Sequence, residues 1–241
     1  MTNSFATSFW AHIPTVTHIP LAFGTTNLGD DIQSYAASSL LDCHQFVNRD
    51  CMEKWPTDAI VPMIGWFGYG KPYTKATCIF AGTHIQRESR KYFSEQRVVE
   101  WIVRSVRDQG FPAMARDLDT RDFLRSVGVE AEFGGCVTQT LGRYDGTRKG
   151  TLVVDVPDES IVGFRDTHYR PYLPLLSPAE RVLEARVQVQ RFARFEVVHT
   201  SRLHVLLPCT ALGTKVVFHR QAAWFQPERL TGFEGLIDAE T

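Results

Sequence analysis

The fold is decided by the stretch Glu196-Val-Val-His-Thr-Ser-Arg-Leu-His-Val-Leu-Leu-Pro-Cys-Thr-Ala-Leu-Gly-Thr-Lys-Val-Val-Phe218. A short apolar run, a polar break at 201–204, an apolar stretch ending at Gly213 and a β-branched run follow one another. This order predicts a strand, a loop, a helix and a second strand. In open α/β sheets, ligands bind at the carboxyl ends of strands, against helix N-termini. The polar break holds Arg202 and His204, a pair that suits a phosphorylated or carboxylated substrate.

Short apolar runs alternate with helical spacing along the rest of the chain, which predicts an α/β fold with mainly parallel sheets. Further strands are expected at 59–64, 77–81, 113–116, 129–133 and 151–156, and helices at 95–107, 121–127 and 178–192. Residues 1–20 and 165–178 are interpreted as irregular, 65–70 as a loop, and 220–241 as a final helix and tail. A polar, glycine-containing hinge at 141–150 predicts two lobes facing a cleft, residues 1–145 and 146–241.

Composition narrows the function classes. The 241 residues carry a formal net charge of −1, so no overall basic field favours nucleic acid, and any anion site must be built locally. The five cysteines show no CxxC spacing, which favours free buried thiols in a reducing cytosol. No secretory signal pattern and no long apolar run occurs, so a cytoplasmic protein without a membrane span is expected.

A second predicted site is the polar loop Asn27-Leu-Gly-Asp30, with Asp31 beside it, at the start of a predicted helix. Gly29 lets a ligand approach the backbone closely, and the helix N-terminus offers free N–H groups. Asp30 suits a general base or an acceptor for sugar hydroxyls. The alternative is an ordinary capped turn.

Two more candidates follow predicted strands. Arg116 stands beside Asp117 at a strand end and would add a cation to the cleft, or it is one half of a surface ion pair. His84 would line the cleft, or it is a partly buried, hydrogen-bonded histidine. For 201–204 the alternative is a helix N-cap at Ser201 with an exposed arginine. No carboxylate or third ligand accompanies His199 and His204, so no zinc site is expected.

Together these segments resemble the polysaccharide pyruvyl transferase family. The resemblance spans about residues 24 to 218, and its motifs occur in the family's order. They are Asn27-x-Gly-Asp30 before a helix with Gln33 and Ala36, Ile64-Gly-Trp66, Ala115-Arg-Asp-x-x-Thr120 followed by Leu124 and Gly128, and Ser201-Arg-Leu-His204 with Leu212-Gly213.

The resemblance implies two Rossmann-like lobes arranged as in GT-B glycosyltransferases. It also implies transfer of the enolpyruvyl unit of phosphoenolpyruvate onto two sugar hydroxyls, which gives a pyruvate ketal and phosphate. Arg116, Arg202 and His204 would then hold the donor, as two guanidiniums and an imidazolium, and Asp30 or Asp31 would move a proton near the acceptor. His204 is a second candidate for proton transfer. The resemblance requires no metal and no cofactor beyond the donor.

Three functions stay open at this point. The first is the ketal-forming pyruvyltransferase acting on a glycan or glycoconjugate, with Asn27, Gly29, His84 and Ser201 completing the substrate site and Trp66, Phe67 or Tyr69 stacking on a sugar. The second is a glycosyltransferase that uses a nucleotide sugar, for which Glu180 and Glu184 are loosely placed as ribose ligands. The third is a non-catalytic protein that binds sugar or phosphate.

Overall fold

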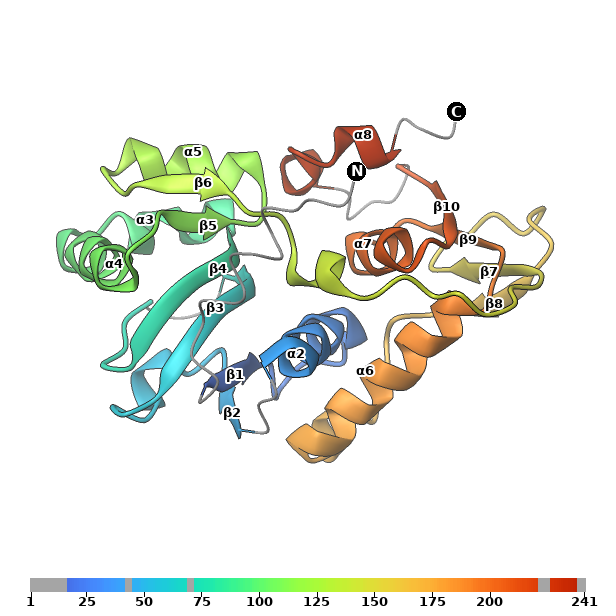
Figure 1. The fold of residues 1–241 in the computed structure, drawn as a ribbon, viewed down its shortest axis with the longest axis horizontal. Helices are drawn as coiled ribbons and strands as arrows, with labels where there is room; N and C mark the ends of the chain where they lie inside the picture. Colours follow the sequence, from blue (N-terminus) through green and yellow to red (C-terminus); the bar gives the residue numbers. More distant parts are fainter. Residues whose placement is uncertain (1–16, 42–44, 69–71, 221–225, 238–241) are drawn as a thin grey trace.

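The structure is a computed structural model that describes residues 17–41, 45–68, 72–220 and 226–237, and it is a mixed α/β fold (Figure 1). Strands β1 to β10 are His18–Leu21, Gln45–Asn48, Ile60–Phe67, Thr77–Ile85, Ala113–Ala115, Ala131–Phe133, Thr151–Val154, Phe164–Asp166, Val197–Thr200 and Lys215–Phe218. Helices α2 to α8 are Leu28–Leu41, Arg90–Phe93, Gln96–Gln109, Leu118–Ser126, Pro178–Ala193, Leu203–Leu212 and Glu234–Ile237. Short 3₁₀ turns η1 to η5 are Met52–Lys54, Arg87–Ser89, Val137–Thr140, Leu173–Leu175 and Pro227–Leu230.

The strands form three sheets, and all strand pairs among the described residues are parallel. The first large sheet has the order β3-β4-β5-β6, the second has the order β10-β9-β7-β8, and β1 pairs with β2. In a parallel sheet all carboxyl ends lie at one edge, so the loops that follow the strands gather there. The prediction of an α/β fold with mainly parallel sheets is confirmed, and this arrangement of strands is compatible with a Rossmann-like fold.

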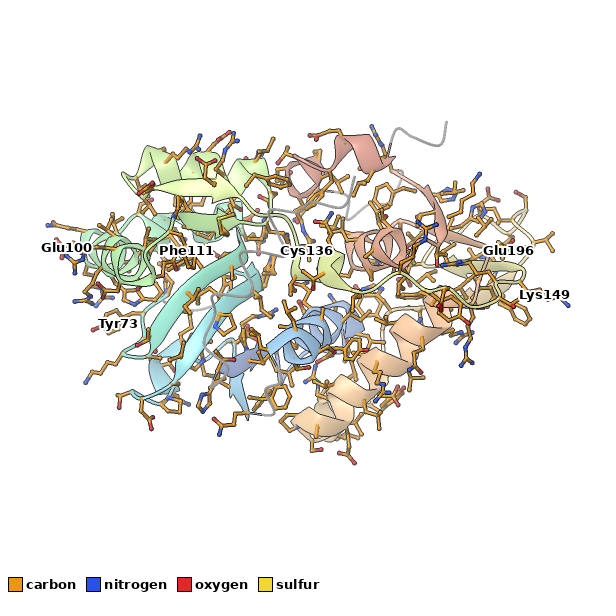
Figure 2. All side chains as sticks on the ribbon, viewed as in Figure 1. Tyr73, Glu100, Phe111, Cys136, Lys149 and Glu196 are labelled. Carbon is orange, nitrogen blue, oxygen red and sulfur yellow. The ribbon has the colours of Figure 1, made fainter. Side chains whose placement is uncertain are left out.

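Two hydrophobic cores hold the molecule together. The first large sheet packs with α4 and α5, while the second packs with α6 and α7. Helix α2 belongs to the core of the second sheet and lies against α6 and α7, although it comes early in the chain (Figure 1). Side chains fill the space between these elements, and Cys136 lies between the two large sheets (Figure 2).

The expected lobe boundary at 145 falls in the loop between η3 and β7. Besides α2, the C-terminal segment also crosses this boundary, because the Leu118 backbone N–H donates to the Thr231 carbonyl at 3.1 Å. The Phe133 and Phe233 rings pack edge to face there, with centroids 5.5 Å apart. The two halves are therefore interleaved by packing rather than joined by a single hinge.

Glycines explain where two predicted strands were too short. The strand predicted over 59–64 continues to Phe67, and the strand predicted over 77–81 continues to Ile85. Gly65 and Gly82 have φ values of +77° and +79°, and the strand register shifts at each of them. Each glycine makes a bulge rather than a strand end, so residues 65–67, expected in a loop, belong to β3.

Several local predictions are confirmed. The stretch 196–218 forms β9, α7 and β10, and Gly213 ends α7 with φ +75°. Cys78, Cys136 and Cys209 are buried free thiols and Cys51 is partly exposed; Cys43 lies outside the described residues. Within the part of the chain that the structure describes, no helix is both long and apolar enough to span a bilayer.

Candidate functional site

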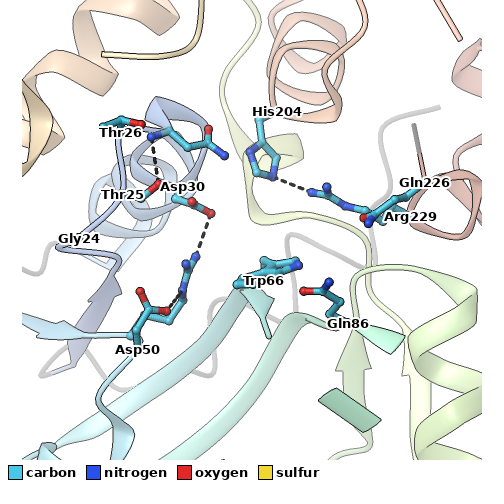
Figure 3. Close-up of a pocket in the computed structure, with 12 residues that line it drawn as sticks. Gly24, Thr25, Thr26, Asp30, Asp50, Trp66, Gln86, His204, Gln226 and Arg229 are labelled. Atoms are coloured by element: carbon cyan, nitrogen blue, oxygen red, sulfur yellow. Dashed lines mark hydrogen bonds and ion pairs between the residues drawn. The ribbon is translucent and has the colours of Figure 1, made fainter. Parts of the chain in front are cut away.

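Two adjoining cavities open between the start of α2, the ends of β3 and β4, and the start of α7. Figure 3 draws the residues that line the larger one. The larger measures about 570 Å³ and the smaller about 200 Å³. Both are lined by Asn27, His204, Gln226 and Arg229, so they form one cleft. The larger adds Gly24, Thr25, Thr26, Asp30, Arg49, Asp50, Trp66 and Gln86, and the smaller adds His168, Ser201, Arg202, Leu203, Phe218 and Leu230.

The loop before α2 brings its predicted residues to this cleft. The Asn27 side chain caps the helix by accepting from the Gly29 backbone N–H at 2.9 Å. A Cβ on Gly29 would overlap the His204 ring, so this position needs glycine for a close approach. Asp30 lines the larger cavity and pairs with Arg49 at 2.8 Å. The loop is therefore the capped turn of the alternative interpretation, and it also lines the cleft.

Asp31 lies outside the lining of either cavity, although it follows Asp30 directly. It is fully buried and holds Arg181 of α6 through two bonds of 3.0 Å. The same guanidinium donates to the carbonyls of Phe23 and Thr25 at 2.7 and 3.3 Å. Burial raises the pKa of the Asp31 carboxyl, and Arg181 opposes that rise. The geometry gives Asp31 a structural task in joining α2 to α6.

His204 stands at the first turn of α7, where both cavities meet. The side-chain amide of Gln33 lies 2.8 Å from its Nε2, and the Arg229 guanidinium lies 3.5 Å from the same atom. Both groups can donate to a lone pair on Nε2. Burial, followed by the charges of Arg229 and Arg116, lowers the pKa of His204 well below its usual value. In the unliganded protein the ring is therefore a neutral imidazole, in contrast to the expected imidazolium.

Arg116 follows β5 and is completely buried, so the alternative of a surface ion pair with Asp117 is wrong. Asp117 Oδ2 lies 3.5 Å from Arg116 Nε, yet none of the three guanidinium nitrogens has a hydrogen-bond partner among the described residues. Asp117 is occupied elsewhere: it caps α5 at the Thr120 N–H, 2.9 Å away, and accepts from His84 Nδ1 at 2.6 Å. Arg116 thus keeps a buried charge with little compensation.

His84 and Arg116 sit behind the cleft wall rather than among its lining residues. His84 is buried and bonded to Asp117, as its alternative reading expected. Burial and the nearby Arg116 charge lower the pKa of His84 to about 4, so it is neutral at pH 7. Arg116 also lowers the pKa of His204 and Arg229, which do line the cleft. The structure brings predicted residues from both halves of the chain into one electrostatic cluster.

Arg229 is a site residue that sequence reasoning missed. It comes from η5, within the segment interpreted as a final helix and tail. Its Nε is buried without a hydrogen-bond partner among the described residues. Burial, then the like charge of Arg116, lowers its pKa to about 10. No local pattern singles out this arginine, because its place depends on how the C-terminal segment packs back on the first sheet.

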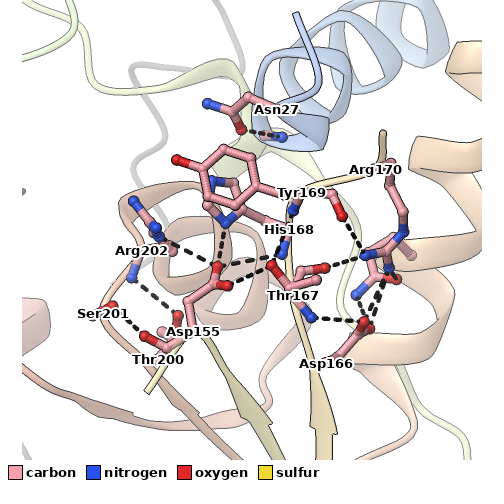
Figure 4. A network of polar contacts seen from close by, with 12 residues as sticks. Asn27, Asp155, Asp166, Thr167, His168, Tyr169, Arg170, Thr200, Ser201 and Arg202 are labelled. Carbon is pink, nitrogen blue, oxygen red and sulfur yellow. Dashed lines mark hydrogen bonds and ion pairs between the residues drawn. The ribbon is translucent and has the colours of Figure 1, made fainter. Parts of the chain in front are cut away.

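Ser201 and Arg202 enter the smaller cavity from the loop after β9. Helix α7 begins at Leu203, so the N-cap residue is Arg202 rather than Ser201, and it makes no side-chain cap. Ser201 Oγ instead donates to the Asp155 carbonyl at 2.8 Å. The Arg202 guanidinium lies over the Tyr169 ring, 5.3 Å from its centroid, with Nε 3.3 Å from Asp155 Oδ2 (Figure 4).

The three aromatic candidates have different positions. Trp66 lines the larger cavity, and the Arg49 guanidinium lies 5.4 Å from the centroid of its ring. Phe67 is buried in the core of the first sheet, and Tyr69 lies outside the described residues. Trp66 is therefore the one of the three that the structure places at the cleft.

The polar groups of the cleft are those of an anion and hydroxyl site. In the described ranges, no three His, Cys, Asp or Glu side chains gather as a metal site would need. His199, noted for its spacing to His204, instead faces His219 across β9 and β10 at 3.1 Å. The cleft offers guanidiniums, the neutral imidazole of His204 and the carboxylates of Asp30 and Asp50, which together can bind an anion beside an alcohol.

Comparison with known proteins shows the fold alone. No protein-family model and no curated protein matches the chain. Among solved structures, a functionally uncharacterized protein from Klebsiella pneumoniae superposes with a TM-score of 0.56 at 15% identity. The likeness covers 95% of this chain and 94% of the other. The architecture is thus shared nearly end to end with a protein of very different sequence.

Proposed function

We propose that the protein is a ketal-forming pyruvyltransferase. It moves the enolpyruvyl unit of phosphoenolpyruvate onto two hydroxyls of a sugar in a glycan or glycoconjugate and releases phosphate. Two Rossmann-like lobes arranged as in GT-B enzymes would carry the site between their facing strand ends. The proposal rests on the sequence motifs and on the cation-rich cleft, and one observation carries it.

That observation is the unsatisfied guanidinium of Arg116. A buried charge without hydrogen bonds is costly, and native proteins retain one where a ligand completes it. Arg229 is close enough for each charge to disfavour the other, and its Nε also lacks a partner among the described residues. A small multiply charged anion held by Arg229 in the cleft would offset this repulsion, with the Arg116 charge acting from behind the cleft wall. Phosphoenolpyruvate has this charge and size.

The two cavities fit the two substrates. The smaller, about 200 Å³, offers Arg202, His204 and Arg229 to a compact donor. The larger, about 570 Å³, offers Asp30 and Trp66 to a sugar ring. Because His204 and Arg229 line both, the donor and the acceptor would meet at their shared wall. In the proposed reaction the donor carbon would lie between an anion clamp and a hydroxyl acceptor.

The chemistry balances with groups that the cleft supplies. The donor methylene gains a proton and becomes the methyl group, which leaves an electrophilic carbon for the first sugar hydroxyl. A second hydroxyl then replaces the phosphate on the same carbon. Of the two hydroxyl protons released, one offsets the proton taken by the methylene and the other leaves with phosphate. We assign the acceptance of a hydroxyl proton to Asp30, which faces the larger cavity, and not to Asp31.

No observation favours the glycosyltransferase alternative. Glu180 caps α6 by accepting from the Ser177 N–H at 2.8 Å, and Glu184 accepts from the Tyr172 hydroxyl at 3.0 Å. Neither carboxylate lines the cleft, so neither is placed to bind a ribose there.

The test is an activity panel. The protein is incubated with phosphoenolpyruvate and a series of galactosides, glucosides and N-acetylhexosamine conjugates, and both phosphate release and the mass gain of the pyruvyl unit are measured. Turnover of at least one acceptor is expected, with Asp30→Asn strongly impaired and the exposed Arg186→Met as a matched control. Heat stabilisation by a nucleotide sugar but not by phosphoenolpyruvate would replace the proposal with a glycosyltransferase. Sugar or phosphate binding without any turnover would replace it with a binding protein.

A further inference from the structure

A second carboxylate–imidazole pair lies at the carboxyl end of β7, on the other side of the cleft from His84 and Asp117. Asp155 accepts a hydrogen bond from His168 Nδ1 and, through Oδ1, one of 2.6 Å from the Thr167 hydroxyl (Figure 4). Its Oδ2 also lies 3.3 Å from Arg202 Nε. One carboxylate therefore fixes an imidazole and a guanidinium at the same time.

The backbone around this pair is held in an uncommon conformation. Asp155 has φ +54°, the one described residue other than glycine with a positive φ. Such strain concentrates at functional sites, where the surrounding contacts impose it. The loop that carries His168 is tied to the other half of the chain, because the Leu28 N–H donates to the His168 carbonyl at 2.9 Å. The Arg170 N–H likewise donates to the Thr26 carbonyl at 2.8 Å.

His168 itself is a wall of the smaller cavity, together with Ser201, Arg202 and His204. His168 is 4% exposed and lines that cavity. Asp155 engages Nδ1, which leaves Nε2 as the ring nitrogen available to a ligand. A carboxylate on Nδ1 fixes the tautomer and the orientation of the ring, which is the arrangement that proton-transfer histidines use.

We propose that His168, positioned by Asp155, is the proton-transfer residue on the donor side of the cleft. This inference rests on the proposed pyruvyltransferase function and adds to it the acid that the reaction needs. Imidazolium Nε2–H gives its proton to the methylene carbon of phosphoenolpyruvate as the carbon–carbon double bond breaks. The neutral ring then regains a proton from solvent, which receives one of the two protons that the sugar hydroxyls release. The other hydroxyl proton leaves with phosphate, so the atoms balance. Asp30 acts from the larger cavity, on the opposite side of the same carbon.

The first pair, His84 with Asp117, shows why position decides the role. It has the same two chemical groups at a comparable distance, yet His84 lines neither cavity. Arg116 stands beside His84 and disfavours its charged form, so it is no acid at neutral pH. We therefore assign His84 to holding Asp117 and Arg116 in place, and His168 to the reaction.

The test compares His168→Ala and His168→Gln with His199→Ala, a histidine on β9 whose ring contacts His219 outside the cleft. Loss of the acid lowers kcat about a hundredfold or more, while the KM for phosphoenolpyruvate changes less than about threefold. His199→Ala keeps wild-type rates. Added imidazoles rescue His168→Ala, and the rescued rate follows the pKa of the added base. Asp155→Asn, which tolerates a positive φ, gives a smaller loss of kcat at similar KM and is not rescued.

The outcomes separate this inference from the function it rests on. If the wild type turns over an acceptor and both His168 variants keep their kcat, or lose only affinity for the donor, the assignment of His168 is overturned and the pyruvyltransferase stands. If His168→Ala loses both its activity and its thermal unfolding transition, it has not folded, and His168→Gln becomes the decisive variant. A folded His168→Gln protein with the wild-type kcat would overturn the assignment. If the wild type turns over no acceptor, both proposals are overturned.

Discussion

Arg181 and Arg116 are both fully buried, and they are bonded in opposite ways. Arg181 donates to both oxygens of Asp31 and to two backbone carbonyls, so its charge and its geometry are satisfied. Arg116 has one loose ion pair with Asp117 and no hydrogen bond among the described residues. We expect a buried arginine of the first kind to hold elements together, and one of the second kind to act on the charge of a bound ligand. Substitutions at the two positions separate these roles.

The largest expected effect is on stability at Arg181. Arg181→Met leaves the Asp31 carboxylate buried without its partner, which lowers the free energy of unfolding by about 3–5 kcal/mol. Urea denaturation measures the change. Arg186→Met, an exposed arginine on the same helix, is the matched control and changes stability by less than about 0.5 kcal/mol. An Arg181→Met protein as stable as the wild type would remove the distinction between the two arginines.

At Arg116 the sign is reversed. Arg116→Met removes a buried charge without hydrogen bonds and relieves its repulsion with Arg229, so we expect the protein to become more stable rather than less. The same change removes the stabilisation that phosphoenolpyruvate gives and lowers turnover about a hundred- to a thousandfold. Calorimetry with and without phosphoenolpyruvate measures both. A destabilised Arg116→Met protein that still responds to the donor would show that Arg116 is structural.

The next prediction concerns stability at low pH, because burial and the nearby Arg116 charge keep His84 neutral. The folded-state pKa of His84 is lowered from 6.5 to about 4, so below pH 6.5 the unfolded chain binds a proton that the native state does not. Stability is therefore full above pH 6.5 and falls as the pH drops toward 4, by at most about 3 kcal/mol from this group. Asp117 and Asp155, whose pKa is lowered to about 2, add a loss only below about pH 3.8.

Asp31, whose pKa is raised to about 7, adds stability as the pH falls over the same range, so the His84 contribution is the difference between the urea midpoints of the wild type and of His84→Gln, whose side chain does not titrate. In His204 the pKa is lowered too, so part of the slope remains in that variant. A midpoint difference between the two proteins that stays constant from pH 7 to pH 4 would contradict the neutral state of His84.

The sequence was sufficient for the parts of the site that local order determines. Asn27, Ser201 and Arg202 reach the cleft because each belongs to a strand–loop–helix unit, and parallel strands gather such loops at one edge. The order of elements likewise predicted the α/β fold, but not that Gly65 and Gly82 would form bulges inside strands. The sequence reads the same for a glycine that ends a strand and for one that bends it.

The rest of the site depends on packing between distant segments. Asp30 and Asp31 were interchangeable in the sequence, yet adjacent helical residues point about 100° apart, and here one faces the cavity while the other faces α6. His168 and Arg229 come from stretches without periodicity, which are placed by contacts with α2 and α5. Whether Arg116 was exposed or buried was also beyond a local pattern, because burial is a property of the assembled sheet.

The smallest expected effect concerns Gly29, which lets helix α2 approach His204. A Cβ at this position overlaps the His204 ring, so Gly29→Ala moves the imidazole away from Gln33 and costs about 1–3 kcal/mol of stability. Turnover falls about tenfold, since the ring lines both cavities. Gly142→Ala, where a Cβ meets open space, is the control and leaves both quantities unchanged. If Gly29→Ala behaves like Gly142→Ala, then the position of His204 does not matter to the cleft, and the binding role rests on the arginines alone.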